Sequence, residues 1–237
     1  MTSTAAADPA ARAGEDRRII VMIGAPGAGK GTQAERLAEA LGLPRISTGE
    51  LFRAALRDGG PLEGKVRRYV ERGVLVPDDL VIDIVGRRLA EADAAEGAIL
   101  DGFPRTRAQA VALDEMLERA RARVTAALYV EVAPELLLER LTGRRICSLD
   151  EGHVYHVTSR PPRVPGICDI DGAELYQRDD DAPATVRSRL ETQLPPMYEV
   201  IDHYCEADVL FGVRGDASAE EVTADLLHAL ASAARSR

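Results

Sequence analysis

The sequence contains no tryptophan, and aromatic residues make up only 4% of its 237 positions. Proteins that hold single-stranded nucleic acid need aromatic rings for base stacking, and a formal net charge of -9 also disfavours a broad nucleic-acid-binding face. Three cysteines are too few for a disulfide scaffold, and no apolar run has the length of a membrane span. These absences predict a cytoplasmic protein with no nucleic-acid or membrane partner. We expect a monomer, because nothing in the sequence marks a subunit interface.

Lysine is scarce as well. The chain has 30 basic residues, of which only Lys30 and Lys65 are lysines, so a lysine inside a glycine-rich loop is a candidate functional residue. The first 18 residues are rich in alanine and mix acidic with basic side chains, which fits neither a secretory signal nor an acid-poor transit peptide. We expect residues 1–18 to be a disordered extension and residues 19–237 to form one core that carries inserts.

Strand-like and helix-like segments alternate along this core. The strand-like segments are 19–23, 98–100, 124–132 and a short one around 207–213, and segments with helical spacing of apolar residues separate them. The alternation predicts an α/β fold in which helices flank a parallel β-sheet that carries a phosphate-binding loop. From residue 144 to about 181 the sequence changes to short polar pieces rich in proline and glycine, which predicts a small β insert.

The stretch GAPGAGKGTQ, residues 24–33, is the clearest functional signal. Its glycines have no Cβ, so that successive backbone N–H groups can converge on phosphate oxygens, and the helix that follows adds the positive end of its dipole. Lys30 supplies a point charge for the β- and γ-phosphates. Gly31 stands where the general pattern has Ser or Thr. We expect Gly31→Ser to impair the protein by crowding the loop.

A second signal is AILDGFPRT, in which an apolar strand ends at Asp101. An acid at the carboxyl end of a strand beside the loop can orient water around a nucleotide-bound magnesium ion. Arginines are a third signal, because phosphoryl transfer needs bidentate donors around the oxygens of the moving group. Spacing alone does not select among the arginines of this chain.

The motifs GAPGAGKGTQ, STGELFR, DGFPRTRAQA, LTGRRIC, VYH and ELYQRDDDAPATVRSRL, in this order, resemble the adenylate kinase family from residue 19 to the last helix. The resemblance implies a phosphate-loop core with a helical insert over the monophosphate, residues 47–76, and a small β lid over the triphosphate, residues 143–181. It also implies the reversible reaction of ATP and AMP to two ADP with Mg²⁺, in nucleotide homeostasis and purine salvage. The expected partners are small nucleotides.

The resemblance also assigns roles to individual residues. The ATP site implied by it comprises Gly27, Ala28, Gly29, Lys30, Gly31, Thr32, Arg140, Arg144, Val154, Tyr155 and Gly215. The implied AMP site comprises Thr48, Arg53, Val74, Leu75, Val76, Gly102, Phe103, Arg105, Gln109, Arg178 and Arg189. The implied catalytic set is Lys30, Asp101, Arg105, Arg140, Arg144, Arg178 and Arg189. Gln109 suits adenine, because an amide can both accept from N6 and donate to a ring nitrogen.

Many relatives bind structural zinc in the lid through two CxxC-like pairs. The corresponding residues here are Cys147, Asp150, Cys168 and Asp171, and Glu151 could replace Asp150 because the first loop is one residue longer. Two thiolates with two carboxylates can form a tetrahedral site, although such mixed sets are weaker zinc signatures than four cysteines. A metal-free, hydrogen-bonded cluster is the alternative, and the sequence leaves both open.

Two other functions are compatible with parts of the pattern. A kinase of another nucleoside monophosphate, such as UMP or CMP, would share most motifs, but Thr48 and Gln109 favour AMP. A phosphate-loop switch protein would need a single nucleotide site and would have no use for DGFPRT and STGELFR as a second phosphate-binding face. The sequence therefore favours an ATP:AMP phosphotransferase.

Overall fold

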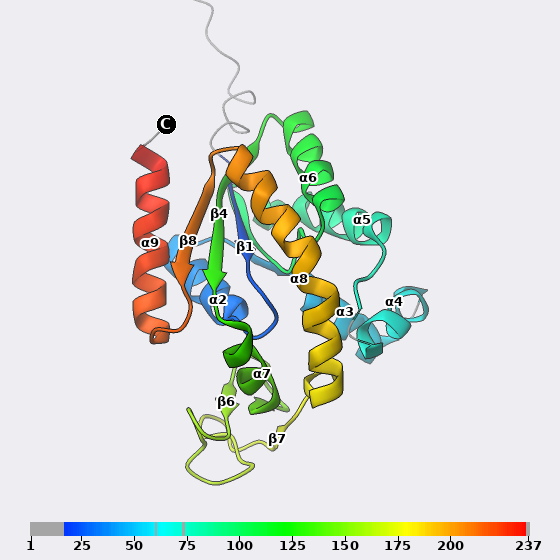
Figure 1. The fold of residues 1–237 in the computed structure, drawn as a ribbon. Coiled ribbons are helices and arrows are strands. Elements are labelled where there is room, and N and C mark those ends of the chain that lie inside the picture. Colours follow the sequence, from blue (N-terminus) through cyan, green and yellow to red (C-terminus); the bar gives the residue numbers. More distant parts are fainter. Residues whose placement is uncertain (1–16, 60, 73, 236–237) are drawn as a thin grey trace, which may run out of the picture.

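The computed structural model describes residues 17–59, 61–72 and 74–235 (Figure 1). Five parallel strands form its central sheet in the order β2-β3-β1-β4-β8. The strands are β1 Arg18–Ile23, β2 Arg45–Ser47, β3 Gly97–Asp101, β4 Arg123–Glu131 and β8 Leu210–Arg214. The predicted α/β fold with a parallel sheet is confirmed.

The apolar run at the start of the core forms the central strand β1. Its residues Ile19 to Ile23 are each at most 3% exposed, as expected for a strand covered on both faces. From β1 the chain first builds β2 and β3 on one side and then β4 and β8 on the other, so the strand order reverses beside β1. Open α/β sheets bind ligands at the carboxyl ends of their strands at such a reversal. The phosphate loop follows β1 there, and Asp101 pairs in register with Met22.

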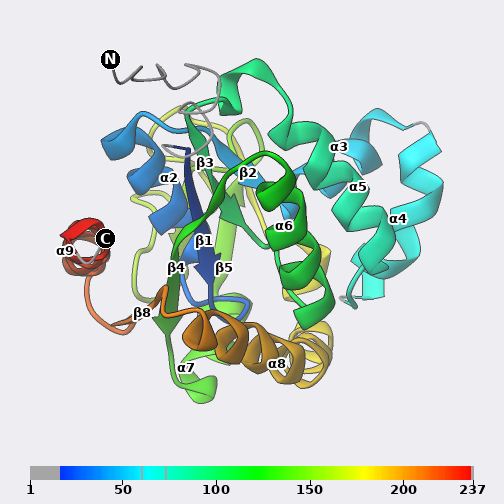
Figure 2. The same ribbon diagram turned by 90° about the horizontal axis from the view of Figure 1, so that it is seen from above.

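Helices cover both faces of the sheet. α2 Lys30–Leu41 and α9 Ala219–Arg235 lie on one face, and α6 Arg107–Arg119 and α8 Pro183–Glu206 lie on the other (Figure 2). α5 Asp78–Leu89 packs against α6, and α7 Pro134–Thr142 packs against α8. The 24-residue α8 continues through Pro195 and Pro196, in agreement with the helical pattern of its sequence. Among the described residues, no helix is both long enough and apolar enough to cross a membrane.

Two projections extend from this core at the carboxyl ends of the strands. α3 Thr48–Asp58 and α4 Pro61–Arg72 lie within the insert expected at residues 47–76. The lid expected at residues 143–181 contains an antiparallel sheet in the order β6-β5-β7, made of β5 Arg144–Cys147, β6 Val154–His156 and β7 Leu175–Tyr176. A short core of Cys147, Tyr155, Cys168 and Leu175 holds the lid together. The remaining elements are the 3-10 turns η1 Ala92–Ala94 and η2 Asp179–Asp181.

The core begins slightly earlier than the sequence predicts. Arg18 is the first residue of β1, and the Arg17 guanidinium donates to the carbonyl oxygens of Ala94 at 3.1 Å and Leu89 at 2.5 Å. These two residues, which we assigned to the extension, are therefore part of the fold. The rest of the expected extension, residues 1–16, lies outside the described residues.

Candidate active site

The phosphate loop connects β1 to α2, and its backbone depends on glycine. Gly27 and Gly29 have φ angles of +84° and +93°, in the left-handed region that side chains disfavour. A Cβ on Gly27 would also lie 2.8 Å from Cγ of Leu141 and 3.2 Å from the carbonyl oxygen of Leu137, both in α7. The loop therefore passes directly against the helix that leads into the lid. α2 begins at Lys30, so its first N–H groups and the positive end of its dipole face the loop.

Gly31 lies in the first turn of α2, where the surrounding atoms leave room for a Cβ. A Cβ there would lie 3.5 Å from Nη2 of Arg45 and 3.6 Å from Oδ2 of Asp101, which are normal van der Waals distances. The expectation that a serine at this position would crowd the loop is therefore not supported.

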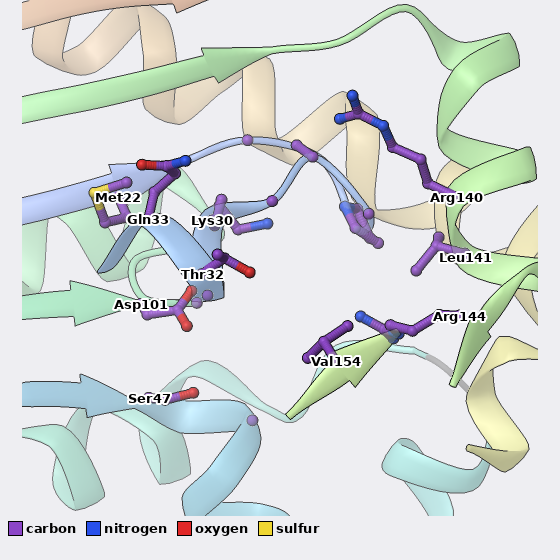
Figure 3. Close-up of a pocket in the computed structure, with 18 of the residues that line it drawn as sticks. Met22, Lys30, Thr32, Gln33, Ser47, Asp101, Arg140, Leu141, Arg144 and Val154 are labelled. Carbon is purple, nitrogen blue, oxygen red and sulfur yellow. The ribbon is translucent and has the colours of Figure 1, made fainter. Parts of the chain in front are cut away.

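The side chains of Lys30 and Asp101 enter the same cavity (Figure 3). The Lys30 ammonium donates to the carbonyl oxygen of Ala25 at 2.8 Å. Burial, partly offset by the attraction of Asp101, lowers the pKa of Lys30 to about 7. Asp101 accepts a hydrogen bond from Arg45 Nη2 at 3.0 Å, and the same nitrogen donates to Glu50 at 2.5 Å. Burial lowers the pKa of Arg45, but these two carboxylates more than reverse the effect and raise it.

Two adjoining cavities collect the residues expected to bind nucleotide. The larger, about 460 Å³, contains the phosphate loop, and the smaller, about 90 Å³, lies between α3, α5 and α6. The larger cavity is lined by Gly27, Ala28, Gly29, Lys30, Gly31, Thr32, Asp101, Arg140, Arg144, Val154, Tyr155, Arg178 and Gly215. The smaller is lined by Thr48, Val74, Leu75, Val76 and Gln109. Both are lined by Arg53, Gly102, Arg105 and Arg189. The exception is Phe103, which is 1% exposed and packs in the core.

Hydrogen bonds fix the polar groups of the smaller cavity. Thr48 Oγ1 donates to the carbonyl oxygen of Gly102 at 2.8 Å. The Gln109 amide oxygen accepts from the Arg105 N–H at 2.8 Å, and the amide nitrogen donates to Asp78 at 2.7 Å. Each end of the amide retains capacity for one further hydrogen bond, so that Gln109 is oriented before any ligand arrives.

Carboxylates of η2 hold two of the expected arginines. Asp181, fully buried, accepts from Arg144 Nε at 2.8 Å and from Arg144 Nη2 at 2.6 Å. Asp180 forms an ion pair with Arg189 at 2.9 Å, and Asp181 forms a longer one with Arg189 at 3.5 Å. These contacts tie the first strand of the lid to the segment that leads into α8, and they aim both guanidinium groups at the cavity.

The guanidinium groups of the cavity are partly withdrawn from water and lie close together. Burial, with a contribution from Arg189, lowers the pKa of Arg105 to about 10. Burial also lowers the pKa values of Arg178 and Arg189. An anionic ligand would relieve this repulsion, so the site is electrostatically suited to phosphate groups.

The other expected arginines face the cavity from α7, the lid and α3. Arg140 Nη1 donates to the carbonyl oxygen of Gly215 at 2.8 Å, and Arg140 and Arg144 lie across the cavity from Lys30 (Figure 3). Arg53 and Arg178 both donate to Glu151 in the lid, at 2.9 Å and 2.5 Å. Burial opposes ionisation of this carboxyl, but the two arginines outweigh it and lower the pKa of Glu151.

A separate cluster lies inside the lid. Cys147, His153, Cys168 and Asp171 bring one potential ligand atom each to within 4.8 Å of one another. Asp171 Oδ2 lies 3.2 Å from Cys147 Sγ and 3.0 Å from His153 Nδ1, and Cys168 Sγ lies 3.6 Å from His153 Nδ1. The backbone N–H of Ala173, followed by these neighbours, lowers the pKa of Asp171 to about 2, so this carboxylate is charged at neutral pH.

The expected fourth ligand, Asp150, is not in this cluster. Its carboxylate accepts from the Gly152 N–H at 2.8 Å in the turn between β5 and β6, and it lies 3.5 Å from the outer nitrogen of His153. The turn thus presents His153 to the thiols and leaves Asp150 behind it. Glu151 does not replace Asp150 either, because it faces the arginines of the nucleotide cavity. Tyr155 Oη accepts from the Asp169 N–H at 2.8 Å, so this side chain also supports the lid interior.

Sequence reasoning missed several residues that position the site. Asp180 and Asp181 belong to the run DDD before α8, which was a readable signal because acids adjacent to phosphate-binding arginines often orient them. Histidine is a common zinc ligand, and His153 is near Cys147 in sequence, so it was a readable candidate for the fourth ligand. Asp78 and Arg45 gave no signal, because their roles depend on contacts between distant segments.

Comparison with known proteins agrees with this geometry. The family model described as adenylate kinase matches residues 22–209. The adenylate kinase of Bacillus subtilis (strain 168) is 48% identical over 207 residues, 87% of this chain and 95% of its own length. That of Exiguobacterium sibiricum is 47% identical over 207 residues, with coverage of 87% and 96%. That of Staphylococcus aureus (strain N315) is 43% identical over 211 residues, with coverage of 89% and 98%. The chain is therefore a phosphotransferase that belongs to the adenylate kinase family.

Proposed function

We propose that this enzyme transfers the γ-phosphoryl group of ATP to AMP in a reversible reaction that yields two ADP and serves nucleotide homeostasis and purine salvage. The observation that carries the proposal is the pair of adjoining cavities with a shared wall of Arg53, Arg105 and Arg189. Two nucleotides that bind there would meet with their phosphates at the arginines. A single-nucleotide switch would not need the second cavity.

The larger cavity would hold ATP. Backbone N–H groups of the loop from Gly27 to Thr32, together with Lys30, are suited to its phosphates, and the segment from Val154 to Tyr155 and the Gly215 backbone to its adenine. The smaller cavity would hold AMP, with the Gln109 amide at the adenine. Because ionised phosphates stabilise the protonated form of Lys30, bound ATP would raise the pKa of this side chain above about 7.

The reaction needs no covalent intermediate on the protein. An oxygen of the AMP phosphate attacks the γ-phosphorus in line, the bond from that phosphorus to the β–γ oxygen breaks, and ADP leaves with both electrons of that bond. The protein contributes position and charge. Lys30, Arg105, Arg140, Arg144, Arg178 and Arg189 surround the place where negative charge is redistributed. Closure of the lid would keep water from competing with AMP as acceptor.

Magnesium is the cofactor implied for ATP. Asp101 fits this role, since its carboxylate is 11% exposed at the carboxyl end of β3 and lines the same cavity as Thr32. It would hold the ion through water, and with Gly31 in the loop most other ligands would come from ATP oxygens and solvent. When bound, the ion neutralises phosphate charge and polarises the γ-phosphoryl group.

Steady-state kinetics with ATP, Mg²⁺ and a series of acceptors tests the substrate assignment. We expect kcat/KM for AMP to exceed that for UMP, CMP and GMP by about 100-fold, because a site built to hydrogen-bond one base leaves buried groups unpaired with another. A preference for a pyrimidine would overturn the assignment to AMP. The two-cavity arrangement is tested independently with two adenosines joined by five phosphates, which should bind more tightly than ATP alone.

We also propose a structural zinc ion in the lid, held by Cys147, His153, Cys168 and Asp171. The chemistry of this donor set supports it, because two thiols, one imidazole and one carboxylate are ordinary zinc ligands. Three of the six distances between the ligand atoms, 3.0, 3.2 and 3.6 Å, approximate the edges of a tetrahedron with bonds of about 2.0–2.3 Å, and all six are within 4.8 Å. The hydrogen-bonded cluster described above is the metal-free alternative.

Metal analysis of the purified full chain distinguishes these two states of the lid. We expect about one zinc per chain, loss of that zinc in His153→Ala, and its retention in the matched variant Asp150→Asn. A zinc-free protein whose melting temperature does not change on chelation would establish the metal-free cluster. We further propose that the enzyme is a cytoplasmic monomer, because its three cysteines are too few for a disulfide scaffold and nothing in the sequence marks a subunit interface.

A further inference from the structure

Asp78 lies behind the wall of the smaller cavity and holds the side chain that is expected to contact the base. It is the first residue of α5, which packs beside α6 (Figure 2). Its Oδ1 accepts a hydrogen bond from Gln109 Nε2 at 2.7 Å, and its Oδ2 accepts one from Thr106 Oγ1 at 2.9 Å. The described residues that line the two cavities include Gln109 but not Asp78. We therefore expect Asp78 to influence a bound base through Gln109.

The Gln109 amide is held at both ends, and the two groups that hold it are of opposite kinds. Its oxygen faces the backbone N–H of Arg105, which can only donate, at 2.8 Å. Its nitrogen faces the carboxylate of Asp78, which accepts. A flipped amide would place N–H against N–H at one end and oxygen against oxygen at the other, so both hydrogen bonds would be lost. Because Gln109 is only 1% exposed, water would not replace them.

An amide fixed in this way distinguishes two kinds of purine. Toward the cavity, Gln109 offers one lone pair of Oε1 and one N–H of Nε2. Adenine complements this pattern, because its N6 amino group donates and its N1 accepts. Hypoxanthine has nearly the same shape but the reverse pattern, since its O6 accepts and its N1–H donates. An amide that could turn over would fit either base, whereas the fixed amide leaves polar groups unpaired against hypoxanthine, which is costly in a buried site.

We propose that Asp78 is a positioning residue that makes the smaller cavity select adenine over 6-oxopurines, because it holds the Gln109 amide in one orientation. The inference rests on the proposed function, in which AMP binds in this cavity with its base at Gln109. Asp78 itself does not touch the nucleotide. Its second hydrogen bond, from Thr106 at the N-terminus of α6, fixes the carboxylate in turn.

Steady-state kinetics with ATP and Mg²⁺, and with either AMP or inosine monophosphate (IMP) as the acceptor, tests this role. The quantity measured is the ratio of kcat/KM for AMP to kcat/KM for IMP, which we expect to be about 100 in the wild-type enzyme. Asp78→Ala should lower this ratio about tenfold, the size expected from the loss of one charge-assisted hydrogen bond. Most of the change should appear in KM, and kcat for AMP should stay within about twofold of the wild type, because the reacting phosphates bind to other residues.

Two further variants separate the hydrogen bond from other effects of the charge. In Asp78→Asn the new oxygen can still accept from Gln109 while the NH₂ group donates to Thr106 Oγ1, so the ratio should return to within about threefold of the wild-type value. Asp79→Ala is the matched control, because Asp79 is an exposed acid in the same first turn of α5. It interacts with the same helix dipole, and its loss should leave the ratio unchanged.

An Asp78→Ala enzyme with the wild-type ratio overturns the proposal, since a merely structural role would weaken the use of AMP and IMP alike. An equal fall of the ratio in Asp79→Ala also overturns it, because the effect would then belong to the end of the helix. A wild-type enzyme that uses AMP and IMP within about threefold of each other overturns it without any variant. Failure of the proposed function looks different, since the wild-type enzyme would then prefer a pyrimidine nucleotide in the acceptor series.

Discussion

Replacement of Asp181 by Asn tests whether the acids of η2 position the arginines of the site. Asp181 is fully buried and receives two charge-assisted hydrogen bonds from Arg144, at 2.8 Å and 2.6 Å, and it lies 3.5 Å from Arg189 Nη1. Asparagine has nearly the same shape. It keeps one oxygen acceptor, presents an NH₂ group where the second oxygen was, and removes the negative charge that balances two guanidinium groups.

The expected size of the effect follows from those contacts. Losing one charge-assisted hydrogen bond to a partly buried arginine costs about 2 kcal/mol, and repulsion between the N–H groups of Arg144 and the new amide adds to it. If the full amount appears in the transition state as misplacement of Arg144, kcat falls by about 30-fold. The same loss of free energy in the empty enzyme lowers the melting temperature by about 4–8 °C.

Steady-state kinetics at saturating Mg²⁺, together with thermal unfolding followed by circular dichroism, measures both effects. Asp179→Asn is the matched control, because Asp179 begins the same acidic run and is exposed, so its kcat and melting temperature should not change. A second variant, Arg144→Lys, keeps the charge but cannot form the bidentate pair, and in the double variant the two losses should not add. An Asp181→Asn enzyme with native kcat would refute the positioning role.

Three further predictions concern the phosphate loop. Lys30→Met should lower kcat by about 1,000-fold through loss of transition-state charge stabilisation, while the exposed Lys65→Met should match the wild type in the same assay; near-native turnover of Lys30→Met would contradict the role of the ammonium. Because the pKa of Lys30 is about 7, most of its side chain is the neutral amine at pH 8, and bound ATP phosphates would favour the protonated form. ATP binding should therefore take up a proton and weaken as the pH rises above 7. Calorimetry in buffers of different ionisation enthalpy measures this proton uptake, which should be absent in Lys30→Met. Gly27→Ala should raise the KM for ATP about tenfold or more, because the new Cβ would collide with α7 at a position where φ is positive. The KM of Gly31→Ser should remain within about threefold of the wild type, because a Cβ there has normal contacts. A larger rise of KM in Gly31→Ser than in Gly27→Ala would contradict this account of the loop.

The sequence predicted most of the fold, because its strongest signals are local. The buried run of β1 and the glycine loop after it need no knowledge of distant residues, and the same holds for the apolar spacing of α8. Two elements were not located. β2 has three residues, too few to display a period, and its existence depends on pairing with β3, a tertiary contact. α4 does carry a local signal, because Leu62, Val66, Tyr69 and Val70 stand at helical spacing and pack against the core, and this signal was missed.

The site shows the same division between local and distant information. Motif positions predicted which residues line the cavities, with Phe103 as the exception because its side chain turns into the core. What the motifs could not supply is the partner of each charged group. The choice of His153 over Asp150 depends on the exact turn between β5 and β6, and the contact of Glu151 with α3 depends on how far the lid closes. Both are properties of the assembled chain.

The pairing of arginines with acids within the cleft has a consequence for ionic strength. Arg144, Arg178 and Arg189 already have counter-ions that belong to the protein, namely Asp181, Glu151 and Asp180. A nucleotide therefore meets arginines whose charge is already partly balanced by these carboxylates, and its phosphates release few dissolved anions when they bind. When a polyanion binds unpaired cations, dissolved counter-ions are released, and the entropy gained by their release falls as the salt concentration rises, so such binding weakens steeply with salt. In this enzyme the affinity for nucleotide should therefore vary only weakly with salt concentration, although its cleft is rich in arginine.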